Sequence, residues 1–148
     1  MSVPIDDGNC FACGPDNPIG MHLHFELDET GLGVVSYAQL GPQFQGWRDI
    51  AHGGIAMSLL DEAMAHAAGA AGHRGVTASL TTRFRKPVPL GKPLVVRGRV
   101  GDARRNVLFL HASVSDADGV VLLEGEGKFV SMGRIDAAVD RRNPSPPA

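Results

Sequence analysis

Two periodicities divide the chain into elements. Residues 53–71 form a nearly uninterrupted run of Ala, Met, Leu and Gly, and this composition favours one long helix. Because the run is apolar on almost every side, we expect the helix to be buried. Elsewhere apolar and polar residues alternate, which is typical of half-buried strands. The alternating stretches are residues 21–29, 31–40, 75–87, 92–102, 106–119 and 120–132.

Turn-forming segments separate these stretches. The sequences "DETG" (28–31) and "DADG" (116–119) are typical of turns, and Pro87 ends the third alternating stretch. The predicted order is two strands, one long helix and then four strands in hairpin succession. An antiparallel sheet wrapped around one buried helix accommodates this order, so we predict an α+β domain.

The composition of the two ends sets the expected domain boundaries. Residues 1–20 are rich in Gly, Pro, Asn and Asp, which favours an irregular arm. Residues 134–148 are polar and rich in proline, which favours a coil-like tail. We therefore expect the folded domain to span residues 21–133.

The overall composition excludes several classes of function. The chain has 148 residues, of which 43% are hydrophobic and 20% charged, as in one globular domain. A formal net charge of -2 and 5% aromatic residues argue against a nucleic-acid or membrane-surface partner. No apolar run reaches the ~20 residues of a membrane-spanning helix. The first ten residues do not resemble a signal peptide, so the expected location is the cytoplasm.

Cys10 and Cys13, in "CFACG", are the only cysteines. A tetrahedral zinc site needs four ligands, and no second cysteine pair follows. His22 and His24 could complete a set, but the spacing is not that of a known zinc finger. A thioredoxin-type motif should open a helix, and "GPDNPIG" cannot do so. We therefore expect a reduced structural turn and no metal site.

The start of the predicted helix carries candidate chemistry. Backbone N–H groups in the first turn of a helix lack intrahelical acceptors and lie at the positive end of its dipole. Gly53 and Gly54 have no side chains to cover these groups, so the amides can bind an anion or a carbonyl oxygen that is becoming one. His52 can hydrogen-bond the same group or brace the loop. The alternative is a glycine-rich loop that only packs tightly.

Two neighbouring carboxylates interrupt the apolar run. Asp61 follows Gly53 by eight residues, which is ~12 Å along a helix. Its carboxylate therefore cannot reach a carbonyl held on its own Gly53, but it could reach one held by a second copy whose helix lies antiparallel. Glu62 points ~100° away from Asp61, so the two are not expected to share a role. We predict that Asp61 is the functional acid, although a solvated helix face is the commoner setting for such residues.

These residues also match a known pattern. The sequence "HGGIAMSLLDEA" resembles the signature of hotdog-fold acyl-CoA thioesterases, most closely the PaaI-like (phenylacetate-pathway) group. The arm "CFACGPDNPIGMHL" is similar to the start of many members. The resemblance implies a hotdog fold and hydrolysis of an acyl-CoA thioester to a carboxylic acid and free coenzyme A. It also implies a homodimer or a dimer of dimers, with no cofactor beyond the coenzyme A of the substrate.

The resemblance assigns roles to individual residues. The amide of Gly53 would polarise the thioester carbonyl, and His52 would orient the thioester or the loop. Asp61, from the partner subunit, would act as nucleophile or as general base on water. Thr77, on the strand after the helix, would lie near the attacking water.

Many members carry an Asn six residues before the His, where this chain has Gly46. Gln45, beside it, is the candidate replacement as an amide donor.

The phosphates of coenzyme A require cations, and the chain offers several near the predicted site. An exposed basic residue is more often plain surface than a phosphate contact. The substrate-binding candidates are Gly54, Arg83, Arg85, Lys86, Arg104 and Arg105. Residues that could line the acyl pocket, or else pack in the core, are Trp47, Met57, Met64 and Phe84.

Two other functions remain open at this point. A non-catalytic module that binds acyl-CoA or an aromatic ligand would keep the pocket and the dimer but would not hydrolyse its ligand. A hotdog dehydratase would need a catalytic histidine acting with the acid, and the position of His52 beside the glycine pair fits oxyanion binding better.

Overall fold

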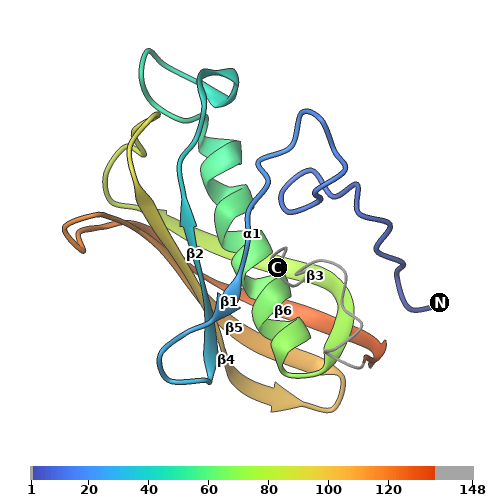
Figure 1. The fold of residues 1–148 in the computed structure, drawn as a ribbon. Coiled ribbons are helices and arrows are strands. Elements are labelled where there is room, and N and C mark those ends of the chain that lie inside the picture. Colours follow the sequence, from blue (N-terminus) through green and yellow to red (C-terminus); the bar gives the residue numbers. More distant parts are fainter. Residues whose placement is uncertain (1, 136–148) are drawn as a thin grey trace.

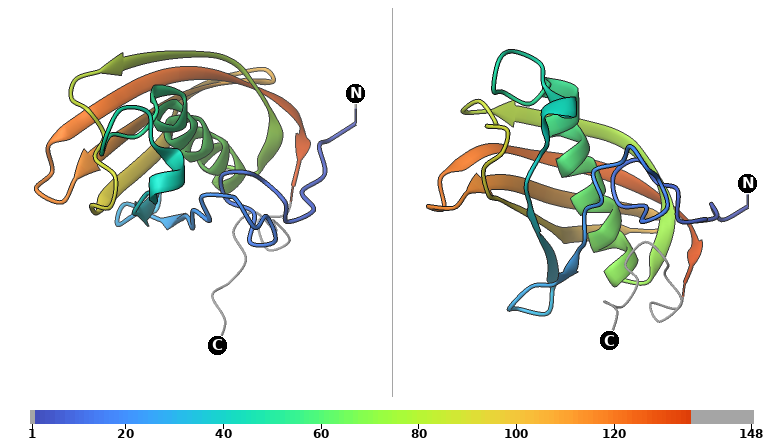
Figure 2. Two further views of the ribbon diagram at one scale, coloured as in Figure 1. Left: turned by 90° about the horizontal axis from the view of Figure 1, so that it is seen from above. Right: turned by 45° about the horizontal axis from the view of Figure 1, so that its top comes forward.

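The computed structural model describes residues 2–135, which form one long helix and a six-stranded antiparallel sheet (Figure 1). The helix α1 spans Gly53–Ala70, and a short 3-10 helix, η1, spans Pro42–Phe44. The strands are β1 (Glu26–Leu27), β2 (Gly33–Ala38), β3 (His73–Phe84), β4 (Leu94–Arg104), β5 (Val107–Asp116) and β6 (Val121–Arg134). Figure 2 shows the sheet curving around one side of α1. The predicted α+β architecture, a sheet wrapped around one central helix, is confirmed.

The position of β3 in the sheet differs from the prediction. The strand order is β1-β2-β4-β5-β6-β3, so β4, β5 and β6 are in hairpin succession but β3 pairs with β6. The segment between β3 and β4 does not turn tightly. Instead it runs beside the loop before α1, where Val88 accepts a hydrogen bond from the N–H of Ala51 at 2.8 Å. This crossover leaves β3 at one edge of the sheet.

The first predicted strand, residues 21–29, is mostly not a strand. Only Glu26–Leu27 pairs with β2. The backbone before it forms hydrogen bonds with the N-terminal arm instead. The N–H of Met21 donates to Phe11 O and the N–H of Leu23 donates to Ala12 O, each at 2.9 Å. The alternation was still informative, since Leu23 is buried and its neighbours are more exposed.

The N-terminal arm is irregular, as predicted, but it is part of the packed core. Ala12 and Cys13 are buried. The ring of Phe11 meets the ring of Phe44 edge-on, with 6.1 Å between centroids. Figure 2 places the arm on the side of α1 that the sheet leaves open. At the other end β6 continues to Arg134, and the remainder of the predicted tail, residues 136–148, lies outside the described residues.

The C-terminal end of α1 lies where the sequence predicted it. The N–H of Ala71 donates to Ala67 O at 3.1 Å, and Gly72 follows with a φ of +89°. A residue in this left-handed conformation commonly ends a helix, and glycine adopts it without strain. The strand β3 begins at the next residue, and the chain reverses there so that β3 runs back alongside α1.

Small residues allow α1 to approach the sheet closely. A Cβ added to Gly98 in β4 would lie 2.4 Å from the carbonyl oxygen of Ala63 in α1. Contacts this short are forbidden, so glycine is required at this position for the helix to sit where it does. Within residues 2–135 no helix is both long and apolar enough to cross a membrane.

Replacement of Gly98 by Ala is expected to lower the free energy of unfolding by about 1–3 kcal/mol, because the new methyl group must push backbone atoms of α1 away. Urea denaturation monitored by circular dichroism measures the change. Gly101→Ala is the matched control in the same strand, since its Cβ would lie no closer than 3.4 Å to its neighbours. Equal stability of the two variants would show that the helix moves without cost.

Candidate active site

The loop that precedes α1 is held by a set of backbone hydrogen bonds. The N–H of His52 donates to Phe44 O at 2.9 Å, and the N–H of Ala51 donates to Val88 O. These bonds tie the start of α1 to η1 on one side and to the segment after β3 on the other. The first turn of the helix therefore has a defined position.

His52 caps the helix, and this corrects one prediction. Its Nδ1 accepts a hydrogen bond from the N–H of Gly54 at 2.9 Å, so the Gly54 amide is not open to a ligand. The N–H of Gly53, the first helical residue, has no intrahelical acceptor, and Gly53 is exposed. Because Nδ1 accepts, a neutral His52 carries its proton on Nε2, which can donate. The helix start therefore offers one backbone donor and one imidazole donor, rather than two amides.

Asp61 and Thr77 meet between α1 and β3. The Thr77 hydroxyl donates to Asp61 Oδ1 at 2.6 Å. Thr77 is exposed and Asp61 is partly exposed, so solvent reaches the carboxylate. A hydrogen bond of this length holds the carboxylate in one orientation and leaves Oδ2 for chemistry.

A β-bulge in β3 gives Thr77 this orientation. Thr77 pairs with Phe129 and Ser79 with Lys128, so Ala78 is an extra residue opposite β6. Side chains alternate between the faces of a regular strand, and a bulge reverses that alternation. As a result Thr77 and Leu80 both face α1. The sequence showed no signal for the bulge, although it did place Thr77 near the site.

The two adjacent carboxylates have separate environments, as the ~100° rotation between successive helical residues predicts. Asp61 faces β3, whereas Glu62 is buried beneath the arm. The helix is continuous from Gly53 to Asp61, so ~12 Å of axial rise separates the Gly53 amide from the Asp61 residue of the same chain.

The loop residues before His52 differ from the pattern that the resemblance suggested. A Cβ on Gly46 would lie 2.9 Å from the Cα of His52, so an Asn would not fit there without a shift of the loop. Gln45 Oε1 accepts a hydrogen bond from the N–H of Asp49 at 3.2 Å. The side chain of Gln45 thus braces the loop that leads to the helix.

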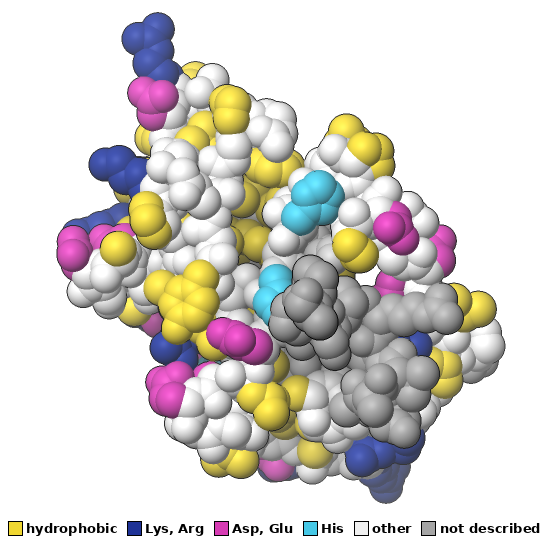
Figure 3. All heavy atoms as spheres, viewed as in Figure 1, with side chains coloured by type: hydrophobic (Ala, Val, Ile, Leu, Met, Phe, Trp, Pro, Cys, Tyr) yellow, Lys and Arg dark blue, Asp and Glu magenta, His cyan; other side chains and the backbone are white. Residues whose placement is uncertain are grey.

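The structure does not bring the predicted basic residues together. Arg83 and Arg85 lie at the C-terminal end of β3, where Arg85 Nη2 contacts Glu124 Oε1 at 2.5 Å. The hydrogen bond from Arg85 lowers the pKa of Glu124 below its usual value. Arg104 and Arg105 lie at the β4–β5 turn, at the other end of the sheet. Figure 3 shows Lys and Arg side chains at the margins of one face and apolar side chains nearer its centre.

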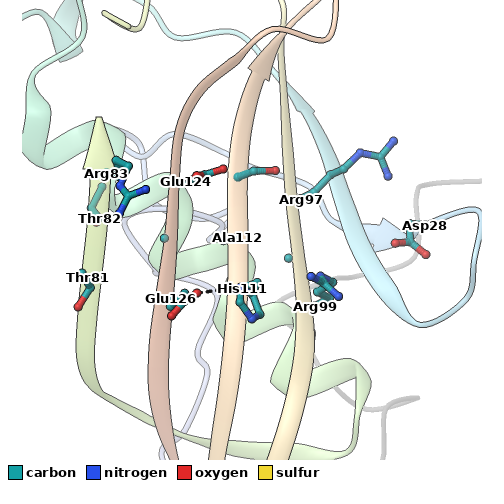
Figure 4. Close-up of a pocket in the computed structure, with 13 residues that line it drawn as sticks. Asp28, Thr81, Thr82, Arg83, Arg97, Arg99, His111, Ala112, Glu124 and Glu126 are labelled. Carbon is teal, nitrogen blue, oxygen red and sulfur yellow. Dashed lines mark ion pairs between the residues drawn. The ribbon is translucent and has the colours of Figure 1, made fainter. Parts of the chain in front are cut away.

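A hollow of about 680 Å³ lies on the face of the sheet that points away from α1 (Figure 4). Arg83, Arg97, Arg99 and His111 line it, together with Glu124 and Glu126. The helix start, Asp61 and Thr77 do not line this hollow. It is therefore separate from the predicted site.

The four predicted acyl-pocket residues have different environments. Met64 is buried in the core, and Met57 is half-buried. Trp47 is exposed on the loop before α1. Phe84 is also exposed, and its ring lies 4.0 Å from the position of a Cβ at Gly53. Phe84 is thus the aromatic residue beside the helix start.

Comparisons with known proteins show which proteins this chain resembles. The family model described as "Thioesterase superfamily" matches residues 49–123, which include the helix start, Asp61 and Thr77. The cattle (Bos taurus) protein acyl-coenzyme A thioesterase THEM4 is 32% identical over 129 residues, which are 86% of this chain and 53% of that protein. The chain thus spans about half the length of this curated relative.

Solved structures share the fold. The thioesterase superfamily protein RHA08564 matches with a TM-score of 0.79 and 27% identity, over 88% of this chain and 68% of that one. The Escherichia coli PaaI protein from the phenylacetic acid degradation operon matches with a TM-score of 0.69 and 21% identity, over 78% and 83% of the two chains. The fold, the family model and the relatives agree that this chain belongs to the thioesterase superfamily and has the hotdog fold.

Proposed function

We propose that this protein is an acyl-CoA thioesterase whose active site is shared between two protomers. The observation that carries the proposal is the separation of the two halves of the site. The donors at Gly53 and His52 lie about 12 Å along α1 from Asp61, which is too far to act on one carbonyl group. A second copy in the opposite orientation supplies the missing half.

The edge strand β3 supports a twofold pairing. It is 12 residues long, and within residues 2–135 it pairs only with β6. Val76 is 45% exposed and Phe84 is 51% exposed, so apolar side chains accompany the open backbone edge. A long uncovered edge strand is a template for pairing with another chain. Antiparallel pairing of two β3 strands would set two α1 helices side by side in opposite directions, with Gly53 of one near Asp61 of the other.

The proposed chemistry uses groups that the chain itself provides. The Gly53 N–H and the His52 Nε2–H would hold the thioester oxygen, on which negative charge develops. Asp61 of the other protomer would take a proton from water or attack the carbonyl carbon itself, while Thr77 keeps the carboxylate in position. The C–S bond then breaks, and coenzyme A leaves as the thiol once its sulfur gains a proton. In the nucleophilic route the acyl group is then held on Asp61 as an anhydride, which water hydrolyses, so both routes end with a carboxylic acid and an unmodified Asp61.

Two similar structures support the choice of substrate and of acid. A Streptococcus mutans structure contains acetyl CoA, and a Streptococcus pneumoniae thioesterase structure contains coenzyme A, each at 16% identity and with TM-scores of 0.70 and 0.71. The pneumococcal protein was also solved with an aspartate or a threonine replaced by alanine, at positions sixteen residues apart. Asp61 and Thr77 are likewise sixteen residues apart.

The proposal assigns the phosphates of coenzyme A to Lys86, which follows the end of β3 close to Phe84 and the helix start. Arg83 lines the hollow on the other face of the sheet, and Arg85 is already paired with Glu124. Arg104 and Arg105 lie at the other end of the sheet, so within one chain they are far from Lys86.

A thiol-release assay with short-chain, long-chain and aromatic acyl-CoA substrates tests the proposed activity. We expect saturable release of coenzyme A with at least one class. Saturable binding without thiol release would instead identify a binding module. Loss or gain of the acyl double bond with the thioester intact would identify a dehydratase. Either result would overturn the proposed hydrolysis.

A further inference from the structure

A second polar cluster lies beneath the arm, apart from the Asp61 site. The sulfur atoms of Cys10 and Cys13 and a carboxylate oxygen of Glu62 all lie within 4.8 Å of one another. The arm supplies the two cysteines and α1 supplies the glutamate, with 3.8 Å between Cys10 Sγ and Glu62 Oε1. Cys13 is 3% exposed and Glu62 is 9% exposed. The arm thus brings two thiols to a buried carboxylate.

His66 lies next to Glu62 but outside the group of three ligand atoms that are within 4.8 Å of one another. His66 follows Glu62 by one helical turn, and its Nε2 lies 3.2 Å from Glu62 Oε1. His66 is 5% exposed. Among the described residues, no donor or acceptor meets the geometric criteria for a hydrogen bond to its Nε2. The ring of Phe25 stacks on the imidazole at 4.5 Å and fixes its plane. The imidazole is thus held in a fixed plane beside the Glu62 carboxylate.

The cysteine turn is arranged to support a thiolate pair. The N–H groups of Ala12 and Cys13 point at Cys10 Sγ, at 3.4 and 3.5 Å. The N–H of Gly14 donates to Cys10 O at 2.9 Å, and a Cβ on Gly14 would lie 2.3 Å from Cys10 N. Only glycine fits after the second cysteine. Hydrogen bonds of this kind to ligand atoms stabilise and orient metal ligands.

We propose that Cys10, Cys13 and Glu62 bind one zinc ion, with His66 beside the Glu62 carboxylate. Two sulfurs and one carboxylate oxygen are ligands that zinc binds in proteins. In a tetrahedral zinc site, neighbouring N, O and S ligand atoms lie about 3.3–3.8 Å apart, given the usual bond lengths. The 3.8 Å separation between Cys10 Sγ and Glu62 Oε1 fits this geometry.

Three protein ligands leave the fourth position of a tetrahedral zinc ion to a water molecule. The ion would join the arm to the helix residue that follows Asp61. This departs from the expectation of a structural turn without metal, for which His22 and His24 were the candidate further ligands. Both are exposed, and His22 Nε2 contacts Asn17 O.

Zinc content of the tag-free full-length protein tests the proposal. After growth in zinc-supplemented medium and desalting, we expect about one zinc ion per chain by mass spectrometry. Cys13→Ser and Glu62→Gln should lose stoichiometric zinc. His24→Gln, at an exposed histidine outside the cluster, is the control and should retain it.

A measurement on the unchanged protein covers variants that fail to fold. After treatment with a chelator, we expect one equivalent of Cd²⁺ to produce the ultraviolet thiolate-to-cadmium band and to protect both thiols from a thiol reagent. Substoichiometric zinc together with no cadmium band would overturn the proposal. So would an unchanged zinc content in Cys13→Ser, or a failure of the protein to take up metal after any Cys10–Cys13 disulfide has been reduced.

Discussion

Replacement of Asp61 by Asn is expected to lower kcat for acyl-CoA hydrolysis by about 10²–10⁴-fold, because an amide neither accepts a proton from water nor attacks the thioester. The substitution keeps the shape of the side chain, and its oxygen can still accept the 2.6 Å hydrogen bond from Thr77. The fold and the melting temperature should therefore be unchanged. Steady-state thiol release on the best substrate of the panel measures the effect.

Asp118→Asn is the matched control for this variant. Asp118 is exposed in the β5–β6 turn, so the same chemical change at that position should leave kcat unaltered. If Asp61→Asn retains activity within a few fold of the unchanged protein, neither the general-base nor the nucleophile role holds.

Replacement of Gly53 by Pro should lower kcat by about 10²–10³-fold, because it removes the N–H that is assigned to the thioester oxygen. Proline is favoured at the first position of a helix, where the N–H has no intrahelical acceptor. The preceding residue, His52, has φ -56° and ψ 138°, a conformation that residues before proline adopt readily. The helix should therefore form normally.

Gly53→Ala separates the effect of the lost N–H from that of added bulk. Its Cβ would meet only the ring of Phe84, at 4.0 Å, which is an ordinary contact. Alanine keeps the N–H, so we expect activity close to that of the unchanged protein. An equal loss in both variants would attribute the effect to crowding beside Phe84 and not to the amide.

Co-expression of the two inactive variants tests whether the site is shared. A mixed dimer of Asp61→Asn and Gly53→Pro has one site with both groups intact and one site with neither, so random pairing should restore about a quarter of the normal activity. Co-expression of Asp61→Asn with the double variant should restore none. Absence of recovery in the first mixture, with mixed dimers present, would place both groups in one protomer and refute the shared site.

The sequence by itself determined the elements whose signals are local. The composition of residues 53–71 predicted α1, and Gly72 marked its end, because helix propensity and helix termination depend on neighbouring residues. The rotation between successive helical residues separated Asp61 from Glu62 before any contact was known. Alternation likewise located β4, β5 and β6, since each has one face in the core.

Only the tertiary structure decided which segments meet. The pairing of β3 with β6, and hence the open edge, follows from a crossover that no local pattern encodes. The bulge at Ala78 turns Thr77 toward Asp61, and the capping bond from Gly54 to His52 removes one of the two expected amides.

The cluster beneath the arm shows the same limit most clearly. Cys10 and Glu62 are 52 residues apart in the chain, and the sequence alone placed the cysteines in a turn without a partner. Periodicity records which way a side chain points relative to its own element. Contacts between distant elements depend on how those elements pack, and packing is a property of the whole chain.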